Sequence, residues 1–269
     1  MKVTYMNHSS FFFEYSDKAI LIDYGELPVR AKRGEISEGV FELARQKSKY
    51  SKLIGYSSHR HEDHYDPGMV QQFLADELLY ILSDEHELEF EEYMDNTNFF
   101  RIFPQTTINI DILHFANAGS TDQGGAVLLQ DHNENFSIYF GGDLAVWDDL
   151  PEFYDGFDKE FVWLKEQVAN FSPVKIAFLP CGTSDGYQEE PLLNGSKDLI
   201  ELMKPQIVIP MHGFGYEHFY KSFAEEMQQR LTDNQVEITT FTSFTKQKFS
   251  NNSIILSYAE NPGDSIVFN

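Results

Sequence analysis

Apolar residues in the first half of the chain occur in short runs broken by polar residues, as in paired strands. Such runs cover residues 2–6, 10–15 and 19–23, and Ser16-Asp17-Lys18 separates the last two as a turn. The pattern predicts further strands at residues 53–57 and 79–82. Residues 99–130 return to the same pattern, with Ile108, Ile110 and Ile112 alternating with polar residues, which indicates one buried face.

Helical spacing is sparser in the first half and frequent in the second. Residues 36–43 show it, and Asp66-Pro67 is typical of a helix start, because aspartate caps the first turn and proline fits the first helical position. The remaining helices are expected at residues 84–94, 161–171, 196–203 with Ser196 as the cap, and 216–231. In the second half they alternate with apolar strands at residues 174–179 and 207–210.

This order of elements bears on domain organisation. The sequence contains no linker, low-complexity stretch or short repeat, so we expect a single domain that covers residues 1–269. Strands dominate the first half and strand–helix alternation the second, which is compatible with two layers of sheet covered by helices.

Composition and charge narrow the classes of partner. The 269 residues are 42% hydrophobic and 15% aromatic, which excludes a disordered chain. A net charge of -23 repels phosphate backbones and anionic membranes, so we expect neither nucleic acid nor membrane as a partner. Cys181 is the one cysteine and cannot form an internal disulfide; no signal peptide pattern or long apolar run occurs. These features predict a cytoplasmic location.

The strongest chemical signal follows the strand predicted at residues 53–57. His59, His61, Asp63 and His64 place four potential metal ligands within six residues. In extended backbone, His59 and His61 leave on the same side of the chain. Imidazole and carboxylate are the usual ligands of zinc and also suit iron or manganese. The alternative is a polar loop with histidines by chance, but its place between an apolar strand and a capped helix favours a site.

The pattern His-X-His-X-Asp-His after a strand resembles the signature of the metallo-β-lactamase-fold hydrolases. Two later segments look like the family's strand ending in Gly-Asp and its last strand ending in histidine: residues 138–143, which end in Asp143, and residues 207–212, which end in His212. The segments at residues 7–11 and 20–23 look like the opening hairpin of the branch that contains ascorbate-6-phosphate lactonase-like proteins.

The resemblance implies a four-layer αββα sandwich with two zinc ions at one edge. It implies that His59 and His61 bind one ion, that Asp63, His64 and His212 bind the other, and that Asp143 bridges them. By the same resemblance, Asp23 orients the histidine loop, and His8 lies in the second shell or touches substrate; a purely structural turn histidine is the alternative for His8. Without the resemblance, Asp143 and His212 are also compatible with ordinary turn and loop positions.

The chain departs from the family where a third histidine is usual. Ser120 stands there, and a serine hydroxyl is a poor zinc ligand beside imidazole. Asp122 either replaces it, which favours a harder ion such as manganese, or caps the loop. In the latter case the first ion binds weakly or only the second site is filled. His114 continues the predicted strand after Ile112, and we expect a hydrogen-bonded core histidine.

We expect a metal-dependent hydrolase that directs an activated water at an ester, lactone or phosphoester bond of a small-molecule substrate. Asp63 would orient the nucleophile and shuttle a proton. A relic metal-binding protein of the same fold is the alternative, and an iron-dependent redox relative ranks last because it relies on the missing histidine. Substrate selectivity is expected in the loops at residues 24–50, 144–160 and 181–195. The side chains expected to line the cleft are Tyr65, Trp147, Tyr187 and Tyr216, whereas Cys181 is read as an ordinary loop thiol.

Overall fold

The computed structural model describes residues 1–83, 93, 95–182, 189–213, 215, 217–242 and 253–268. By their contacts these residues form two compact units, each built on one sheet. Unit 1 contains residues 1–102, 241–242 and 259–268, and unit 2 contains residues 103–240 and 253–258. The prediction of a helix over residues 84–94 concerns a segment that lies largely outside the described residues.

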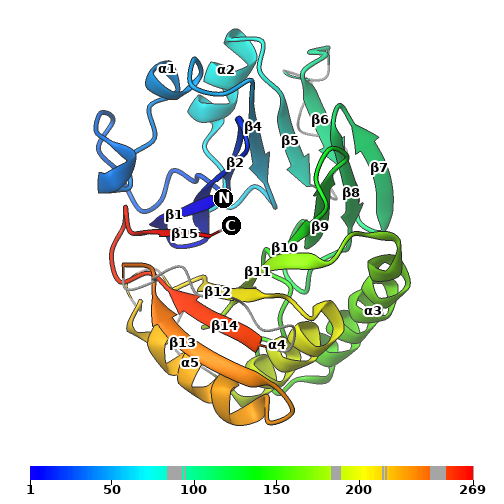
Figure 1. Cartoon of the computed structure of the whole chain (residues 1–269). Helices are drawn as coiled ribbons and strands as arrows, with labels where there is room; N and C mark the ends of the chain where they lie inside the picture. Colours follow the sequence, from blue (N-terminus) through cyan, green and yellow to red (C-terminus); the bar gives the residue numbers. More distant parts are fainter. Residues whose placement is uncertain are drawn as a thin grey trace. The chain divides into compact units, whose positions relative to one another are not determined.

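The sheet of unit 1 has seven strands (Figure 1). In spatial order they are β15 (Ser265–Val267), β1 (Lys2–Asn7), β2 (Ser10–Tyr15), β3 (Lys18–Ile22), β4 (Lys52–Ser57), β5 (Tyr80–Ser83) and β6 (Phe99–Ile102). The strands from β15 to β3 pair antiparallel, and those from β3 to β6 pair parallel. The strands predicted at residues 2–6, 10–15, 19–23, 53–57 and 79–82 are thus confirmed to within one or two residues.

A hydrophobic core holds the sheet of unit 1 against its helices. Helix α2 (Pro67–Ala75) contributes Met69, Val70 and Phe73 to it, and strand residues such as Tyr80 pack on them. Asp66 caps this helix as predicted, since its Oδ1 accepts from the N–H groups of Gly68 at 2.7 Å and Met69 at 3.1 Å. Capping satisfies donors that have no partner inside the helix.

The prediction of one continuous helix at residues 36–43 is wrong. The structure has a 3-10 turn η1 (Ile36–Glu38) and a separate helix α1 (Leu43–Gln46). Gly39 ends the first turn in the left-handed conformation, with φ of 71°. Glycine adopts this conformation readily and ends the turn, so the apolar residues of this segment lie on two short helical turns rather than on one helix.

The sheet of unit 2 has eight strands. In spatial order they are β13 (Gln235–Thr240), β14 (Ser253–Tyr258), β12 (Ile207–Met211), β11 (Val174–Pro180), β10 (Ser137–Phe140), β9 (Val127–Asp131), β8 (Leu113–Asn117) and β7 (Thr106–Ile110). Strands β13 to β10 pair parallel, and β10 to β7 pair antiparallel. The antiparallel pairing of β9 with β10 makes these two strands a hairpin.

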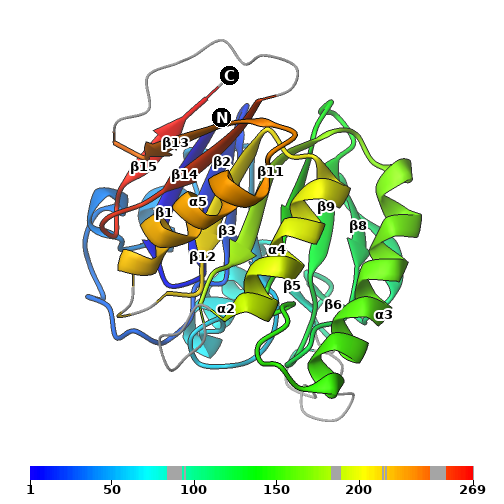
Figure 2. The same cartoon turned by 90° about the horizontal axis from the view of Figure 1, so that it is seen from below.

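Three helices lie side by side on one face of the unit 2 sheet (Figures 1 and 2). They are α3 (Pro151–Gln167), followed by the turn η2 (Val168–Asn170), α4 (Glu190–Met203) and α5 (His218–Arg230). Helix α4 packs on β11, and α5 packs on β12, β13 and β14. None of the described helices combines the length and apolar composition that crossing a bilayer requires.

Two of these helices begin earlier than the sequence pattern predicts. Helix α3 starts at Pro151, so half of the predicted loop at residues 144–160 is helical. Helix α4 starts at Glu190, and Ser196, predicted as its cap, lies inside the helix and is buried. In both cases proline stands in the first helical turn, where its missing N–H costs nothing. The same turn contains a glutamate, whose negative charge interacts favourably with the positive end of the helix dipole.

Candidate metal centre

The first set of candidate ligands lies where two parallel strands of unit 1 end. Ile22 of β3 is in register with Tyr56 of β4, so both strands end at the same edge of the sheet. Asp23 follows β3 directly, and its N–H donates to the carbonyl of Tyr56 at 2.9 Å. The histidine loop follows β4. The pairing of β3 with β4 therefore brings the carboxylate of Asp23 beside the loop that carries His59 to His64.

Asp23 organises this loop through three contacts. Its Oδ1 accepts from the N–H of Ser58 at 2.7 Å, and its Oδ2 accepts from the Ser58 hydroxyl at 2.6 Å. Oδ2 also lies 2.7 Å from Nδ1 of His64. Burial raises the pKa of Asp23, and the hydrogen bonds from His64 and Ser58 act in the opposite direction. Since the carboxylate accepts, Nδ1 of His64 carries the proton and Nε2 is left as the atom suited to bind a metal.

His59, His61 and Asp63 form a compact group of potential ligands. Nε2 of His59 lies 3.0 Å from Nδ1 of His61, with the rings edge to face. The Ser58 hydroxyl lies 3.0 Å from Nδ1 of His59, the other nitrogen of that ring. One ligand atom from each member of the group lies within 4.8 Å of the others. Ligands of tetrahedral zinc at about 2.0 Å from the ion are spaced about 3.3 Å apart, so this donor set fits such an ion.

His8 belongs to the same neighbourhood. Its Nε2 lies 3.1 Å from Oδ2 of Asp63, and that oxygen is 3.7 Å from Nε2 of His64. The rings of His8 and His64 meet edge to face at 5.2 Å. His8 adopts a left-handed backbone with φ of 51° in the turn between β1 and β2. It therefore occupies a turn and also contacts a candidate ligand.

The second set of candidate ligands lies in unit 2, again at the ends of parallel strands. Asp143 follows β10 and His212 follows β12. Nδ1 of His212 donates to the carbonyl of Gly182, which follows β11, at 3.0 Å. Its Nε2 lies 3.6 Å from Oδ2 of Asp143. Both side chains are buried. The hydrogen bond to Gly182 fixes His212 with Nε2 toward the carboxylate, the arrangement seen for histidines that bind metals.

The loop that carries Ser120 is tied to the Asp143 loop. The hydroxyl of Thr121 donates to the carbonyl of Ala145 and accepts from its N–H at 3.1 Å. Ser120 uses its hydroxyl oxygen to accept from the N–H of Asp122 at 3.2 Å. The carboxylates of Asp122 and Asp143 offer oxygens within 4.8 Å of one another. Asp122 is thus near the predicted bridging residue, whereas Ser120 is engaged with its own loop.

No sequence signal marks Glu160, whereas Trp147 is predicted to line the cleft and Cys181 to be an ordinary loop thiol. Glu160 of α3 is buried and accepts from the N–H of Gly119 at 2.7 Å, which anchors the Ser120 loop. The indole of Trp147 donates to the carbonyl of Asp143 at 3.1 Å, and its ring lies 5.0 Å from that of His212. Trp147 therefore lies beside the candidate ligands. Cys181 lies in the loop after β11, as predicted, and its side chain is fully buried.

Some expectations from the sequence are corrected. His114 is half-buried rather than in the core: a turn at Asp111, with φ of 52°, separates β7 from β8, so His114 does not continue the face of Ile110. Its Nδ1 lies 2.8 Å from Oδ1 of Asn109, so the predicted hydrogen bonding is present. Tyr65 lies in the hydrophobic core of unit 1 rather than in a cleft. Tyr187 and Tyr216 lie outside the described residues.

Comparison with known proteins extends this description. The model of the beta-lactamase superfamily domain matches residues 2–154. No curated protein matches the sequence. Among solved structures, a metallo hydrolase, Igni18, from the archaeon Ignicoccus hospitalis is similar at a TM-score of 0.60 and 15% identity, over 98% of this chain and 97% of that chain.

Two further solved structures, of an isothiocyanate hydrolase and of a diiron β-hydroxylase, are also similar to this chain. An isothiocyanate hydrolase from Delia radicum gut bacteria is similar at a TM-score of 0.57 and 15% identity, over 100% of this chain and 99% of that one. CmlA, a diiron β-hydroxylase from Streptomyces venezuelae, is similar at a TM-score of 0.56 and 12% identity, over 86% of this chain and 51% of that one. At such identities the likeness concerns the fold.

These matches confirm the predicted fold class, the αββα sandwich of the metallo-β-lactamase type. None of them supports the narrower resemblance to the ascorbate-6-phosphate lactonase-like branch. With more than half of its residues matched by the family model, and with the histidine loop that the sequence resemblance rests on, the chain belongs to the beta-lactamase superfamily and has the metallo-β-lactamase fold.

Proposed function

We propose that this protein is a metal-dependent hydrolase of small molecules that acts on an ester, lactone or phosphoester bond. The observation that carries the proposal is the group formed by His59, His61 and Asp63, whose ligand atoms lie within 4.8 Å of one another beside a histidine that Asp23 holds in one tautomer. Holding several imidazole nitrogens and a carboxylate this close together is unfavourable without a cation between them. The arrangement of this loop is therefore explained by a bound metal ion.

The donor set supports two ions, with zinc as the first candidate. His59 and His61 would hold one ion, Asp63, His64 and His212 the other, and Asp143 would contribute to both. Because the Ser120 hydroxyl is engaged in its loop and Asp122 lies near Asp143, Asp122 is the residue that would complete the first ion. An additional carboxylate favours a harder ion, so manganese or iron is the alternative, and a single bound ion is the outcome if Asp122 does not participate.

Metal ions held there supply Lewis-acid activation of water and of a carbonyl or phosphoryl oxygen. The protein's own residues would orient this water and exchange its proton. Asp63 is partly exposed and has His8 at 3.1 Å, so a proton taken up by its carboxylate has an imidazole to which it can pass. Asp23 is fully buried and holds the loop through Ser58 and His64, so its role is to position ligands.

The test begins with elemental analysis of protein purified without added metal. The protein is then assayed on 4-nitrophenyl acetate, a γ-lactone and bis(4-nitrophenyl) phosphate, with chelator and after metal is restored. We expect one or two equivalents of metal, turnover of at least one compound, loss with chelator and recovery with zinc or manganese. Full metal occupancy without turnover on these three compounds would support the alternative, a relic metal-binding protein.

Matched variants separate the ligands from other acidic and imidazole groups. His59→Ala and Asp143→Asn should lower metal content and turnover together. His132→Ala and Asp148→Asn change exposed residues of the same types and should change neither. Asp63→Asn distinguishes two roles: metal retained with turnover lost indicates proton transfer, whereas loss of both indicates that the carboxylate acts mainly as a ligand.

A further inference from the structure

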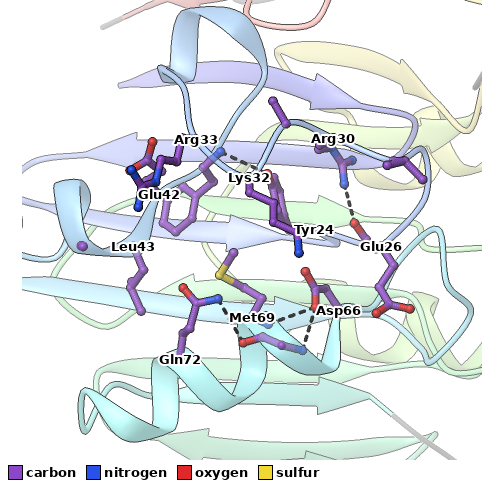
Figure 3. Close-up of a pocket in the computed structure, with 16 residues that line it drawn as sticks. Tyr24, Glu26, Arg30, Lys32, Arg33, Glu42, Leu43, Asp66, Met69 and Gln72 are labelled. Carbon is purple, nitrogen blue, oxygen red and sulfur yellow. Dashed lines mark hydrogen bonds between the residues drawn. The ribbon is translucent and has the colours of Figure 1, made fainter.

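Unit 1 contains a cavity of about 510 Å³ that involves none of the candidate metal ligands. It is lined by the loop after β3, by the start of α1 and by the first turns of α2. Figure 3 shows Arg30, Lys32 and Arg33 along one side of it, with Asp66, Met69 and Gln72 of the α2 segment on the other. Cavities of this size are typical of sites for small organic molecules.

Burial lowers the pKa of Arg30, and the nearby charge of Asp66 acts in the opposite direction without forming an ion pair with it. Within the described part of the chain, no carboxylate lies within ion-pair distance of Arg30, Lys32 or Arg33. This is unusual in a chain of net charge -23, where acidic residues outnumber basic ones by 43 to 20. Three of those 20 basic residues stand within four positions of one loop. Repulsion among them is relieved by an anion.

The acidic residues that line the cavity are mostly engaged elsewhere. Asp66 caps α2. Glu42 accepts from the N–H of Gly34 at 2.7 Å and pairs with Arg45 at 3.1 Å. Glu26 is exposed. None of these carboxylates forms an ion pair with Arg30, Lys32 or Arg33, although the charge of Asp66 acts on Arg30.

Arg30 adds a buried guanidinium. Its Nη1 donates to the carbonyl of Gly25, and the group lies over the ring of Tyr24 at 4.4 Å. Nε and Nη2 are buried and have no hydrogen-bond partner among the described residues. These two atoms form the edge of a guanidinium that binds carboxylate or phosphate in a bidentate manner. Because both atoms are buried, an oxyanion in the cavity that Arg30 lines meets the positive charge of the guanidinium, and a hydrogen bond to this edge requires the side chain to turn toward the ligand.

The remaining walls are apolar. Phe41, Leu43 and Met69 line the cavity, together with Val29, which is 86% exposed. An exposed valine beside a cavity gains contacts when an apolar group binds against it. We propose that this cavity is a binding site for a small organic anion, with its carboxylate or phosphate held by Arg30, Lys32 and Arg33 and its apolar part against Phe41, Leu43 and Met69.

The proposal is tested by calorimetric titration of the full chain, as purified, with phenyl phosphate, benzoate, inorganic phosphate and benzyl alcohol. Phenyl phosphate or benzoate should bind more tightly than inorganic phosphate, which lacks the apolar part, and than benzyl alcohol, which lacks the charge. Raising the salt concentration should weaken the binding of the two aromatic anions. Equal affinity for the neutral and the charged aromatic compounds would overturn the proposal.

Variants locate the site. Lys32→Met and Arg33→Met change exposed residues, so folding should be unaffected, and the double variant should weaken binding of the aromatic anion by roughly tenfold or more. Arg30→Lys keeps the charge and loses the bidentate edge, so it should also weaken binding. Lys49→Met removes an exposed cation of unit 1 that does not line the cavity and should leave affinity unchanged.

The last control separates this site from the metal centre, to which anions also bind. Titration is repeated in the presence of EDTA, with circular dichroism to verify the fold. Binding that persists with EDTA supports the cavity. Binding that disappears while the fold is intact, or that is unchanged in the Lys32→Met/Arg33→Met variant, assigns the anion to another place and overturns the proposal. This outcome leaves the hydrolase proposal untouched.

Discussion

Nδ1 of His64 lies 2.7 Å from Oδ2 of Asp23, and both side chains are fully buried although 41 positions separate them in the sequence. This contact exists because β3 and β4 are parallel neighbours that end at the same edge of the sheet. It decides which nitrogen of His64 is protonated. The availability of Nε2 as a ligand thus depends on a carboxylate that need not touch the metal.

Asp23→Asn should weaken metal binding by about 10- to 100-fold. If the amide oxygen continues to accept from the N–H of Ser58, the amide NH2 faces His64 and can only donate. His64 then turns to the tautomer with the proton on Nε2, which cannot bind a metal. The change is measured by competition for zinc with a chromophoric chelator, alongside thermal unfolding.

Asp17→Asn is the matched control. Asp17 precedes β3 and is exposed, so this variant should keep the metal affinity of the wild type. An Asp23→Asn protein that folds and binds zinc as tightly as the wild type would show that Asp23 does not set the tautomer of His64.

The close approach of Gly25 to the histidine loop gives a second prediction. A Cβ at this position would lie 2.3 Å from the backbone carbon of Asp63 and 2.5 Å from the carbonyl oxygen of Glu62. Backbone atoms cannot yield as a flexible side chain can, so Gly25→Ala should displace the loop. We expect a loss of about 1–3 kcal/mol in the free energy of unfolding together with weaker metal binding.

Gly156→Ala provides the comparison. Gly156 lies inside α3, and its Cβ would meet only a methyl group of Thr121 at 3.3 Å. Alanine is the better helix former, so this variant should be close to neutral or more stable. Chemical denaturation of both variants checks the pair, and equal stability of Gly25→Ala and wild type would contradict the close approach.

Local signals predicted much of unit 1. Alternating apolar runs located its strands, and Asp66-Pro67 located the start of α2, because capping and the fixed φ of proline act within a few residues. The starts of α3 and α4 were missed by up to ten residues, since Gly156 in α3 and Asn194-Gly195 in α4 are poor helix formers that interrupt the predicted spacing. The glycine at position 39 likewise divides apolar spacing that looks continuous in the sequence.

The site shows the same division between local and distant information. His59, His61, Asp63 and His64 are visible as a cluster because they are adjacent in the sequence. The anchoring of the Ser120 loop by Glu160 was not predictable, since a buried glutamate within an amphipathic helix has no signature until the loop that it contacts is known. Similarly, the basic run at residues 30–33 looks like an ordinary charged loop until α2 is placed opposite it.

Glu190 and Arg230 give a prediction on pH. The two carboxylate oxygens of Glu190 accept from Nη1 and Nη2 of Arg230 at 2.9 and 2.7 Å, joining α4 to α5. These hydrogen bonds lower the pKa of Glu190 from its ordinary value of 4.5. A lowered pKa in the folded state means that the stabilisation is present above pH 4.5 and is lost as the pH falls through the folded pKa.

The stability difference between wild type and Glu190→Gln should therefore be small but measurable at pH 7 and should shrink as the pH falls below 4.5. Urea denaturation at a series of pH values measures it, and high salt should reduce it because the pair is exposed. Glu152→Gln, at the exposed start of α3, is the control. A difference that grows as the pH falls would contradict the direction of the pKa shift.

Cys181 gives the last prediction, on thiol reactivity. The side chain is fully buried, and burial raises its pKa well above the ordinary value of 9.0. Because the thiolate is the reactive form, the folded protein should react with a disulfide reagent at pH 8 only through unfolding, and at the same rate as unfolding when the reagent is in excess. The reaction followed by absorbance, with glutathione as the reference thiol, checks this.

The unfolded chain releases its thiol proton near pH 9 while the folded chain retains it, so wild type should also lose stability relative to Cys181→Ala as the pH rises through 9. Rapid labelling under native conditions would mean that the end of β11 opens locally, and the rate of that opening would then replace global unfolding as the quantity measured.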